Sequence, residues 1–195
     1  MGPTYTLLTN EDRNRYDDIG YRLALAARWK LGSAGFFAQP EVAFTNTRGQ
    51  SYIISYYRVP QFPDGDTFSH RIHREELAML LGRHTSHHTY VLVGPVLALN
   101  QQQAQLAAPS GSVAAVYNSL FQTVEPIQLL VQAGVGVTFR RFDFNLRLEQ
   151  SLTPYTRRGT FEGNSYGYEQ QIRQGLFTAG FLLYKRRAHQ VAARP

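Results

Sequence analysis

Residues 129–152 read LLVQAGVGVTFRRFDFNLRLEQSL, and this stretch decides the fold class of the chain. It contains two runs in which apolar and polar residues alternate, and the runs meet at Arg140 and Arg141. A period of two is the signature of a β-strand, because successive side chains of a strand point to opposite faces. The stretch therefore predicts a β-hairpin with one apolar face and one polar face.

The two predicted strands of this hairpin sort their side chains cleanly. The apolar face carries Val131, Ala133, Val135, Val137, Phe139, Phe142, Phe144, Leu146 and Leu148. The other face carries Gln132, Gly134, Gly136, Thr138, Asp143, Asn145, Arg147 and Glu149. A helix with this sequence would scatter its charges around its whole surface, so the period favours strands.

Similar alternation, or richness in strand-forming residues, recurs along the chain and predicts about eight strands. They are expected at residues 4–8, 19–31, 35–45, 75–83, 88–99, 129–139, 142–152 and 174–185. Short and long connections alternate between them. The short connections are residues 32–34, 84–87 and 140–141, and the long ones are residues 9–18, 46–74, 100–125 and 153–173. In an up-and-down barrel, alternate connections lie at opposite ends, and outer-membrane barrels have short periplasmic turns and longer extracellular loops.

Composition narrows the class of protein. The 195 residues suit one domain, which we expect to consist of a barrel at about residues 4–186 and a basic tail at residues 187–195. The chain has no run of the roughly 18 apolar residues that a membrane helix needs. Its net charge of +6 is spread among acids and belongs to no recognisable nucleic-acid motif, so we expect no nucleic-acid partner. There is no cysteine, which excludes thiol chemistry and zinc-finger sites.

Two kinds of barrel fit these strands, and they differ in which face meets water. A soluble lipocalin-like barrel, which would bind an apolar ligand, turns its apolar face inward, whereas a membrane barrel turns it outward. An Arg on the lipid face near the midplane costs roughly 2–4 kcal/mol, so a membrane barrel needs its charges inside. The small residues on the charged face would leave room for them. We therefore favour a closed antiparallel up-and-down eight-stranded transmembrane β-barrel, with short periplasmic turns and long extracellular loops.

This barrel predicts two sets of residues. The expected lumen charge network consists of Arg22, Arg28, Glu41, Glu76, Arg147 and Glu149. The expected lipid-facing girdle consists of Tyr21, Trp29, Phe36, Phe44, Phe139, Phe142 and Phe144. Pro40 and Pro95 fall inside the strand patterns, and we expect a local bulge at each because proline cannot donate a ladder hydrogen bond.

Five sequence fragments, together with the order in which they occur, are similar to those of a known family. They are FAQPE at 37–41, ELAMLL at 76–81, YVLVGP at 90–95, AGVGV at 133–137 and NLR at 145–147. Together they resemble the PorT-like outer-membrane β-barrel family of gram-negative bacteria over residues 19–184. Ala78 and Thr138 depart from the family's usual Pro and Asp. The resemblance implies a fold and a place in the bacterial outer membrane, but PorT's association with a protein-secretion system does not transfer on likeness of fold.

From these features we expect a non-catalytic structural or binding component of the cell envelope, without cofactor or metal. Met1-Gly2-Pro3 is not followed by the apolar segment of a signal peptide, so we expect that signal to have been removed or trimmed from this chain. The expected partners are outer-membrane lipid and, through the loops, other envelope or secretion proteins. The lumen charges favour a plug of paired ions over a selectivity filter, because buried ions must find partners.

Three further hypotheses concern chemistry. His84, His87 and His88 fall on a predicted turn where metal ligands can converge, although no Cys or paired acid accompanies them. A lipid-modifying enzyme would need a catalytic cluster, and the candidate residues for it are Ser69, His70, His73 and Glu75 or Glu76. An adhesive loop surface is the third, and its candidates are Tyr52, Tyr56, Tyr57, Tyr155, Tyr166 and Tyr168.

Overall fold

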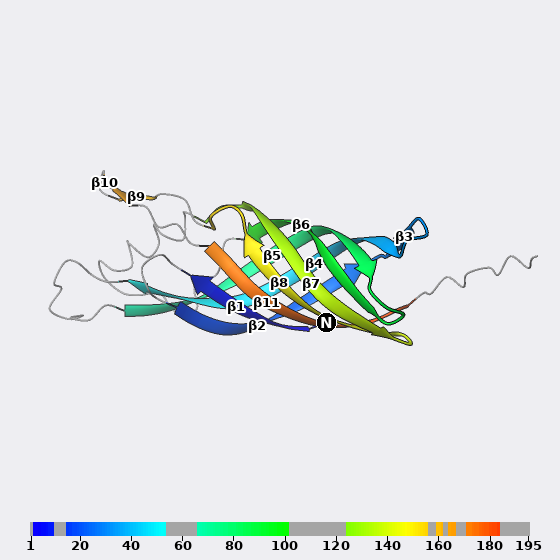
Figure 1. Cartoon of the computed structure of the whole chain (residues 1–195). Coiled ribbons are helices and arrows are strands. Elements are labelled where there is room, and N and C mark those ends of the chain that lie inside the picture. Colours follow the sequence, from blue (N-terminus) through cyan, green and yellow to red (C-terminus); the bar gives the residue numbers. More distant parts are fainter. Residues whose placement is uncertain are drawn as a thin grey trace, which may run out of the picture.

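The computed structural model describes residues 2–9, 15–53, 66–101, 124–155, 159–161, 164–166 and 171–183. Eight antiparallel strands form the wall of a barrel (Figure 1): β1 (Gly2–Thr9), β2 (Arg15–Ala26), β4 (Phe36–Ile53), β5 (Asp66–His84), β6 (Thr89–Gln101), β7 (Ile127–Phe139), β8 (Phe142–Ser151) and β11 (Gln171–Phe181). Strand β3 (Trp29–Leu31) continues β2, and β9 (Gly159–Phe161) pairs with β10 (Asn164–Tyr166) in a separate small hairpin. No helix within the described ranges is long and apolar enough to cross a membrane.

The strands follow one another around the barrel in chain order. The sheet runs β2-β1-β11-β8-β7-β6-β5-β4, and pairing between β2 and β4 joins its two ends. That closing pair runs from Tyr21 opposite Asn46 to Ala26 opposite Glu41. The predicted all-β, up-and-down barrel of eight strands is confirmed. The basic tail predicted at 187–195 lies outside the described residues.

The predicted short connections are confirmed, but the predicted loop boundaries are wrong. Residues 32–35, 85–88 and 140–141 form the three short turns, which we call the short-turn end. At the opposite end β4 continues to Ile53 and β5 already begins at Asp66, inside the loop expected at residues 46–74. The sequence of these extensions no longer alternates between apolar and polar residues, while the ladder of backbone pairs continues.

No bulge forms at either proline. The pairing of β4 with β5 keeps one register through Pro40, which lies opposite Met79. On its other side Pro40 accepts a hydrogen bond from the backbone N–H of Ala27 at 3.1 Å, and β2 is interrupted at this point before β3 resumes in the same register. The β5–β6 pairing likewise lapses beside Pro95 and resumes without a shift. Each proline therefore removes ladder bonds without inserting a residue, which is why the expected bulges were wrong.

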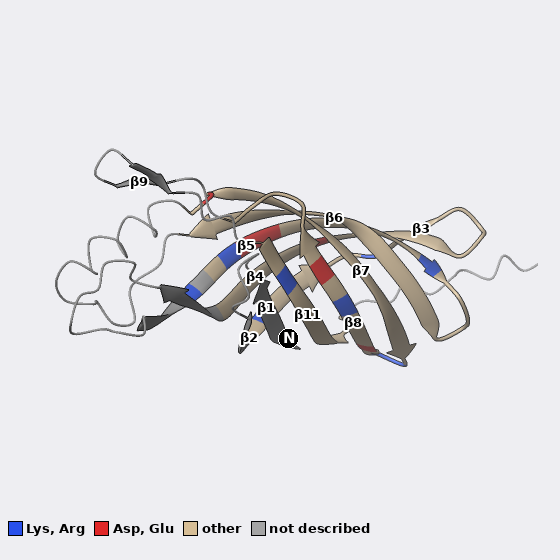
Figure 2. Cartoon of the chain, turned by 60° about the vertical axis from the view of Figure 1, so that its left-hand side comes forward, with Lys and Arg blue, Asp and Glu red and all other residues tan. Residues whose placement is uncertain are grey.

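The distribution of side chains is the reverse of that in a soluble protein. In β8 the apolar residues Phe142, Phe144, Leu146 and Leu148 are exposed, and the polar residues between them are buried. Figure 2 shows neighbouring red and blue bands on β5 and β8, where acidic and basic residues lie close together on one strand. The ten residues of β8 match the roughly 9–11 that a tilted membrane strand needs. An apolar outer surface around a charged interior is the arrangement of a transmembrane barrel, and it does not fit the soluble lipocalin-like alternative.

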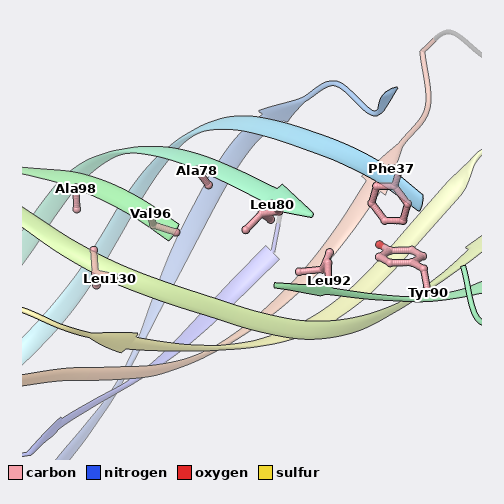
Figure 3. Close-up of a cluster of buried hydrophobic side chains, with 8 residues drawn as sticks. All are labelled: Phe37, Ala78, Leu80, Tyr90, Leu92, Val96, Ala98 and Leu130. Atoms are coloured by element: carbon pink, nitrogen blue, oxygen red, sulfur yellow. The ribbon is translucent and has the colours of Figure 1, made fainter. Parts of the chain in front are cut away.

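The sequence predicted a polar lumen filled by side chains, but part of the interior is apolar. Strand β6 turns Tyr90, Leu92, Val96 and Ala98 inward. They form a buried apolar cluster with Phe37, Ala78, Leu80 and Leu130 (Figure 3). Both faces of β6 are apolar over this length, so the sequence alone did not reveal which face points inward. The charged side chains are therefore concentrated on the other strands.

Candidate functional site

Six charged side chains meet in the middle of the barrel, and we call them the central network. They are Arg22, Glu41, Arg74, Glu76, Arg147 and Glu149, each 3% exposed or less. Strand β2 supplies one of them, β4 one, β5 two and β8 two. The alternation of each strand points them inward, and the three guanidinium groups match the three carboxylates in charge.

Glu41 connects the two sides of the lumen. Its carboxylate accepts hydrogen bonds from Arg22 Nη1 at 2.5 Å and from Arg147 Nη2 at 3.0 Å. Arg147 lies on β8 and Glu41 on β4, and these strands are diametrically opposite in the order around the barrel. A direct ion pair between opposite walls occupies the axis of the barrel at this level.

Arg74 extends the network toward the loop end. Its Nη2 donates to Glu76 Oε1 and to Glu149 Oε1, both at 2.7 Å. Glu76 also accepts from Arg22 at 3.0 and 3.1 Å. Glu149 accepts from the side-chain amides of Gln132, at 2.6 Å, and Gln174. Each carboxylate thus accepts from at least two donors, so all three buried anions are paired.

A second cluster closes the barrel at the short-turn end. The guanidinium of Arg28 lies between two aromatic rings, 4.6 Å from the centroid of Phe37 and 4.3 Å from that of Tyr90. It donates to Gln39 Oε1 at 2.7 and 2.9 Å and to Asp143 at 3.4 Å. Asp143 also accepts from the Tyr90 hydroxyl at 2.7 Å. We call Arg28, Phe37, Tyr90 and Asp143 the aromatic cap.

Two glycines make room for the aromatic cap. A Cβ atom added to Gly82 would collide with the ring of Phe37, and one added to Gly136 would collide with the ring of Tyr90. Both glycines lie at inward-facing positions, opposite the aromatic residues on the neighbouring strands. Gly136, one of the small residues noted in the sequence, and Gly82, which was not noted there, therefore make room for the two rings that enclose Arg28.

The structure brings together five of the six residues expected in the lumen network. The sixth, Arg28, lies apart in the aromatic cap and pairs with Asp143. Arg74 was missed, because it was assigned to a loop, although its position two residues before Glu76 places both on the same face of a strand. Of the residues expected in the girdle, all lie on the outer surface and are exposed except Phe44, which is half-buried between Tyr21 and His73.

The candidates for metal and catalytic chemistry do not converge. His84 packs on the rings of Phe37 and Tyr90, whereas His88 Nδ1 lies 3.2 Å from the carbonyl oxygen of Thr138. Across the part of the chain that the structure describes, no group of three His, Cys, Asp or Glu residues could hold a metal ion.

In the candidate catalytic cluster the two acids separate. Glu76 faces the lumen and is bound by two arginines, whereas Glu75 is exposed and accepts from Gln101 at 2.7 Å. His73 stacks on Phe44. The side chains of Ser69 and His70 lie outside the described residues. Within the described part of the cluster, one acid is therefore bound in the central network and the other faces away from it.

One candidate for an adhesive surface is wrong. Tyr155 is buried against Ile172 and Val124, so it packs the base of a loop and presents no free surface. The side chains of the other five tyrosines, Tyr52, Tyr56, Tyr57, Tyr166 and Tyr168, lie outside the described residues.

Comparison with known proteins gives a distant likeness of fold. No family model matches the chain, and no curated protein matches it. Among solved structures it is similar to the crystal structure of Ail, the attachment invasion locus protein of Yersinia pestis, in complex with the heparin analogue sucrose octasulfate. The two share 10% sequence identity with a TM-score of 0.46, over 92% of this chain and 93% of that one. At this similarity the likeness carries no inference about function, which rests on the geometry of the barrel.

Proposed function

We propose that this protein is an outer-membrane β-barrel with a closed lumen, and that it serves as a non-catalytic structural or binding component of the bacterial envelope. The observation that carries the proposal is the distribution of side chains, in which a charge-matched network lies inside the barrel and apolar residues face outward. We call these exposed apolar residues of the wall the apolar belt; they include Val42, Leu77, Val93, Val135, Leu146 and Phe177. In this proposal the girdle residues expected from the sequence face lipid.

The closed lumen argues against transport. The Arg147–Glu41 ion pair joins opposite walls, and the aromatic cap fills the barrel nearer the short-turn end. An eight-stranded barrel has an interior just wide enough for side chains, so we expect these two layers to block an aqueous path through the part of the barrel that the structure describes. The short turns would lie in the periplasm and the longer connections outside the cell, where any binding function would reside.

The resemblance to PorT-like proteins concerns the fold and the place in the outer membrane, and the proposed partners follow from that place. Contacts with other envelope or secretion proteins would be made through the connections at the loop end, because surface loops carry most binding functions, and outer-membrane lipid would surround the barrel wall. The ordered fragments of sequence support this kinship.

Three measurements test the proposal. Membrane extraction of the full chain should require detergent, and the folded barrel should migrate differently on a gel before and after heating. A monodisperse protein purified without detergent would overturn the membrane assignment. In planar bilayers the reconstituted protein should give no stable single-channel steps, and such steps would overturn the closed lumen.

A further inference from the structure

The short-turn end carries cations from three separate hairpins. Arg83 on β5 and the pair Arg140 and Arg141 in the β7–β8 turn are exposed. Lys30 on β3 is exposed as well, on the lumen side of the mouth of the barrel, opposite Phe37. Figure 2 shows blue segments at β3 and at the turn between β7 and β8. We call these four residues the basic rim. They lie where the apolar belt ends.

No exposed acid offsets the basic rim in the described part of this end. In residues 27–38, 81–92, 135–146 and 177–183 the single acidic residue is Asp143. Asp143 is buried, and Arg28, Tyr90 and Thr138 surround it with donors. The rim therefore presents only positive charge to its surroundings. The loop end differs, since exposed Glu75 and exposed Arg173 both occur there.

Two of the rim cations lie over aromatic rings of the outer surface. The guanidinium of Arg83 is 5.2 Å from the ring centroid of Phe36, and that of Arg140 is 5.4 Å from the ring centroid of Phe139. Both rings are about half exposed. The cation–π interaction with such a ring holds the guanidinium close to the barrel wall, at the border between the apolar belt and water. That border is the level at which lipid phosphates lie.

We propose that the basic rim binds the phosphate groups of anionic phospholipids in the leaflet around the short-turn end. This inference rests on the proposed membrane function and adds to it a preferred lipid class. Guanidinium groups bind phosphate oxygens through paired N–H donors, and a partly desolvated Arg beside a ring binds them more strongly than a hydrated one. A membrane partner fits better than a soluble polyanion, because each Arg–ring pair is continuous with the apolar belt.

The chain contains its own probe for this proposal. Trp29 is the single tryptophan, is 59% exposed, and lies next to Lys30. Two residues further along, Leu31 pairs with Phe36, which in turn pairs with Arg83. A brominated lipid in contact with this part of the wall will quench the fluorescence of Trp29. Quenching of Trp29 therefore reports which lipids gather beside Lys30 and Arg83, which are two of the four residues of the basic rim.

The experiment places the full chain in phosphatidylcholine vesicles that contain increasing fractions of brominated phosphatidylglycerol or brominated phosphatidylcholine. We expect the brominated phosphatidylglycerol to quench with an apparent binding constant at least about twofold higher at low salt, falling toward parity in 0.5 M NaCl. K30Q/R83Q should reach parity at low salt. R173Q, which removes an exposed cation from β11 at the loop end, should keep the preference.

The outcomes separate the two proposals. Equal quenching by both lipids in the unsubstituted protein would overturn the basic rim as an anionic-lipid site while leaving the membrane barrel intact. A preference that survives in K30Q/R83Q would also overturn it, provided that heat-modifiable migration shows the variant to be folded. Absence of quenching by either lipid would overturn both proposals, since Trp29 would then not face lipid.

Discussion

Replacing Glu41 by Gln removes the carboxylate that joins the two walls of the barrel. Glu41 accepts from Arg22 and Arg147 and from the side-chain amide of Gln39. Arg22 retains Glu76 as an ionic partner, but Arg147 retains only the neutral oxygen of Gln132, at 3.2 Å. The central network changes from three cations and three anions to three cations and two anions.

The expected cost follows from this imbalance. Removing one partner of a buried ion pair typically destabilises a protein by about 3–5 kcal/mol, because the remaining charge is left in a medium of low polarity. E41Q/R147Q restores the balance, leaving Arg22 and Arg74 with Glu76 and Glu149. We therefore expect the double variant to be more stable than the sum of the two single losses predicts, by about 1–3 kcal/mol.

Urea unfolding of the reconstituted barrel measures both quantities, with Trp29 fluorescence and heat-modifiable migration as the readouts. Glu75→Gln is the matched control, because Glu75 is a neighbouring carboxylate of the same barrel that is exposed and not part of the central network. It should change the free energy of unfolding by no more than about 0.5 kcal/mol. Equal costs for E41Q and E75Q, or strict additivity of E41Q and R147Q, would refute the charge-matched lumen.

Two other substitutions test the cap and the belt. Gly136→Ala should destabilise the barrel by about 1–3 kcal/mol, because the new methyl group meets the Tyr90 ring, whereas Gly180→Ala, whose nearest neighbour is at 3.6 Å, should be tolerated. Equal urea midpoints for these two variants would contradict the packing of the aromatic cap. Leu146→Arg places a charge on the outer surface of β8 and should cost roughly 2–4 kcal/mol if Leu146 meets lipid near the midplane. An unchanged yield of folded, membrane-inserted Leu146→Arg protein would contradict the lipid-facing belt.

The sequence predicted the wall of the barrel well wherever one face of a strand was apolar and the other polar. Strand β8 is the clearest case, since every inward residue from Asp143 to Glu149 is polar. Prediction failed where that contrast disappears. The sequence of the β4 and β5 extensions does not alternate between apolar and polar residues, so periodicity did not show where these strands end. Strand β6 is apolar on both faces over most of its length, so periodicity did not show which face points inward.

The candidate site was predictable as a set of inward charges but not as a set of pairs. Alternation alone places Glu41 and Arg147 in the lumen. Their pairing depends on which strands lie opposite one another, and that follows from closure of the barrel. Arg74 was missed for a different reason. Its neighbours on the outward face of β5, His73 and Glu75, are polar, so the alternation that identifies a strand in the sequence is absent there.

The pairing of Glu41 with Arg147 also constrains how the barrel assembles. The two residues are 106 positions apart, and Arg22 and Glu76 are 54 positions apart. A single hairpin that entered the membrane first, such as β7–β8, would bring Arg147 into lipid without the carboxylate of Glu41. Ionised groups in hydrocarbon are costly, so stepwise insertion of hairpins is disfavoured. The charged side chains enter the membrane at a low free-energy cost only where the sheet already encloses them. Closure of the barrel and its insertion therefore have to proceed together.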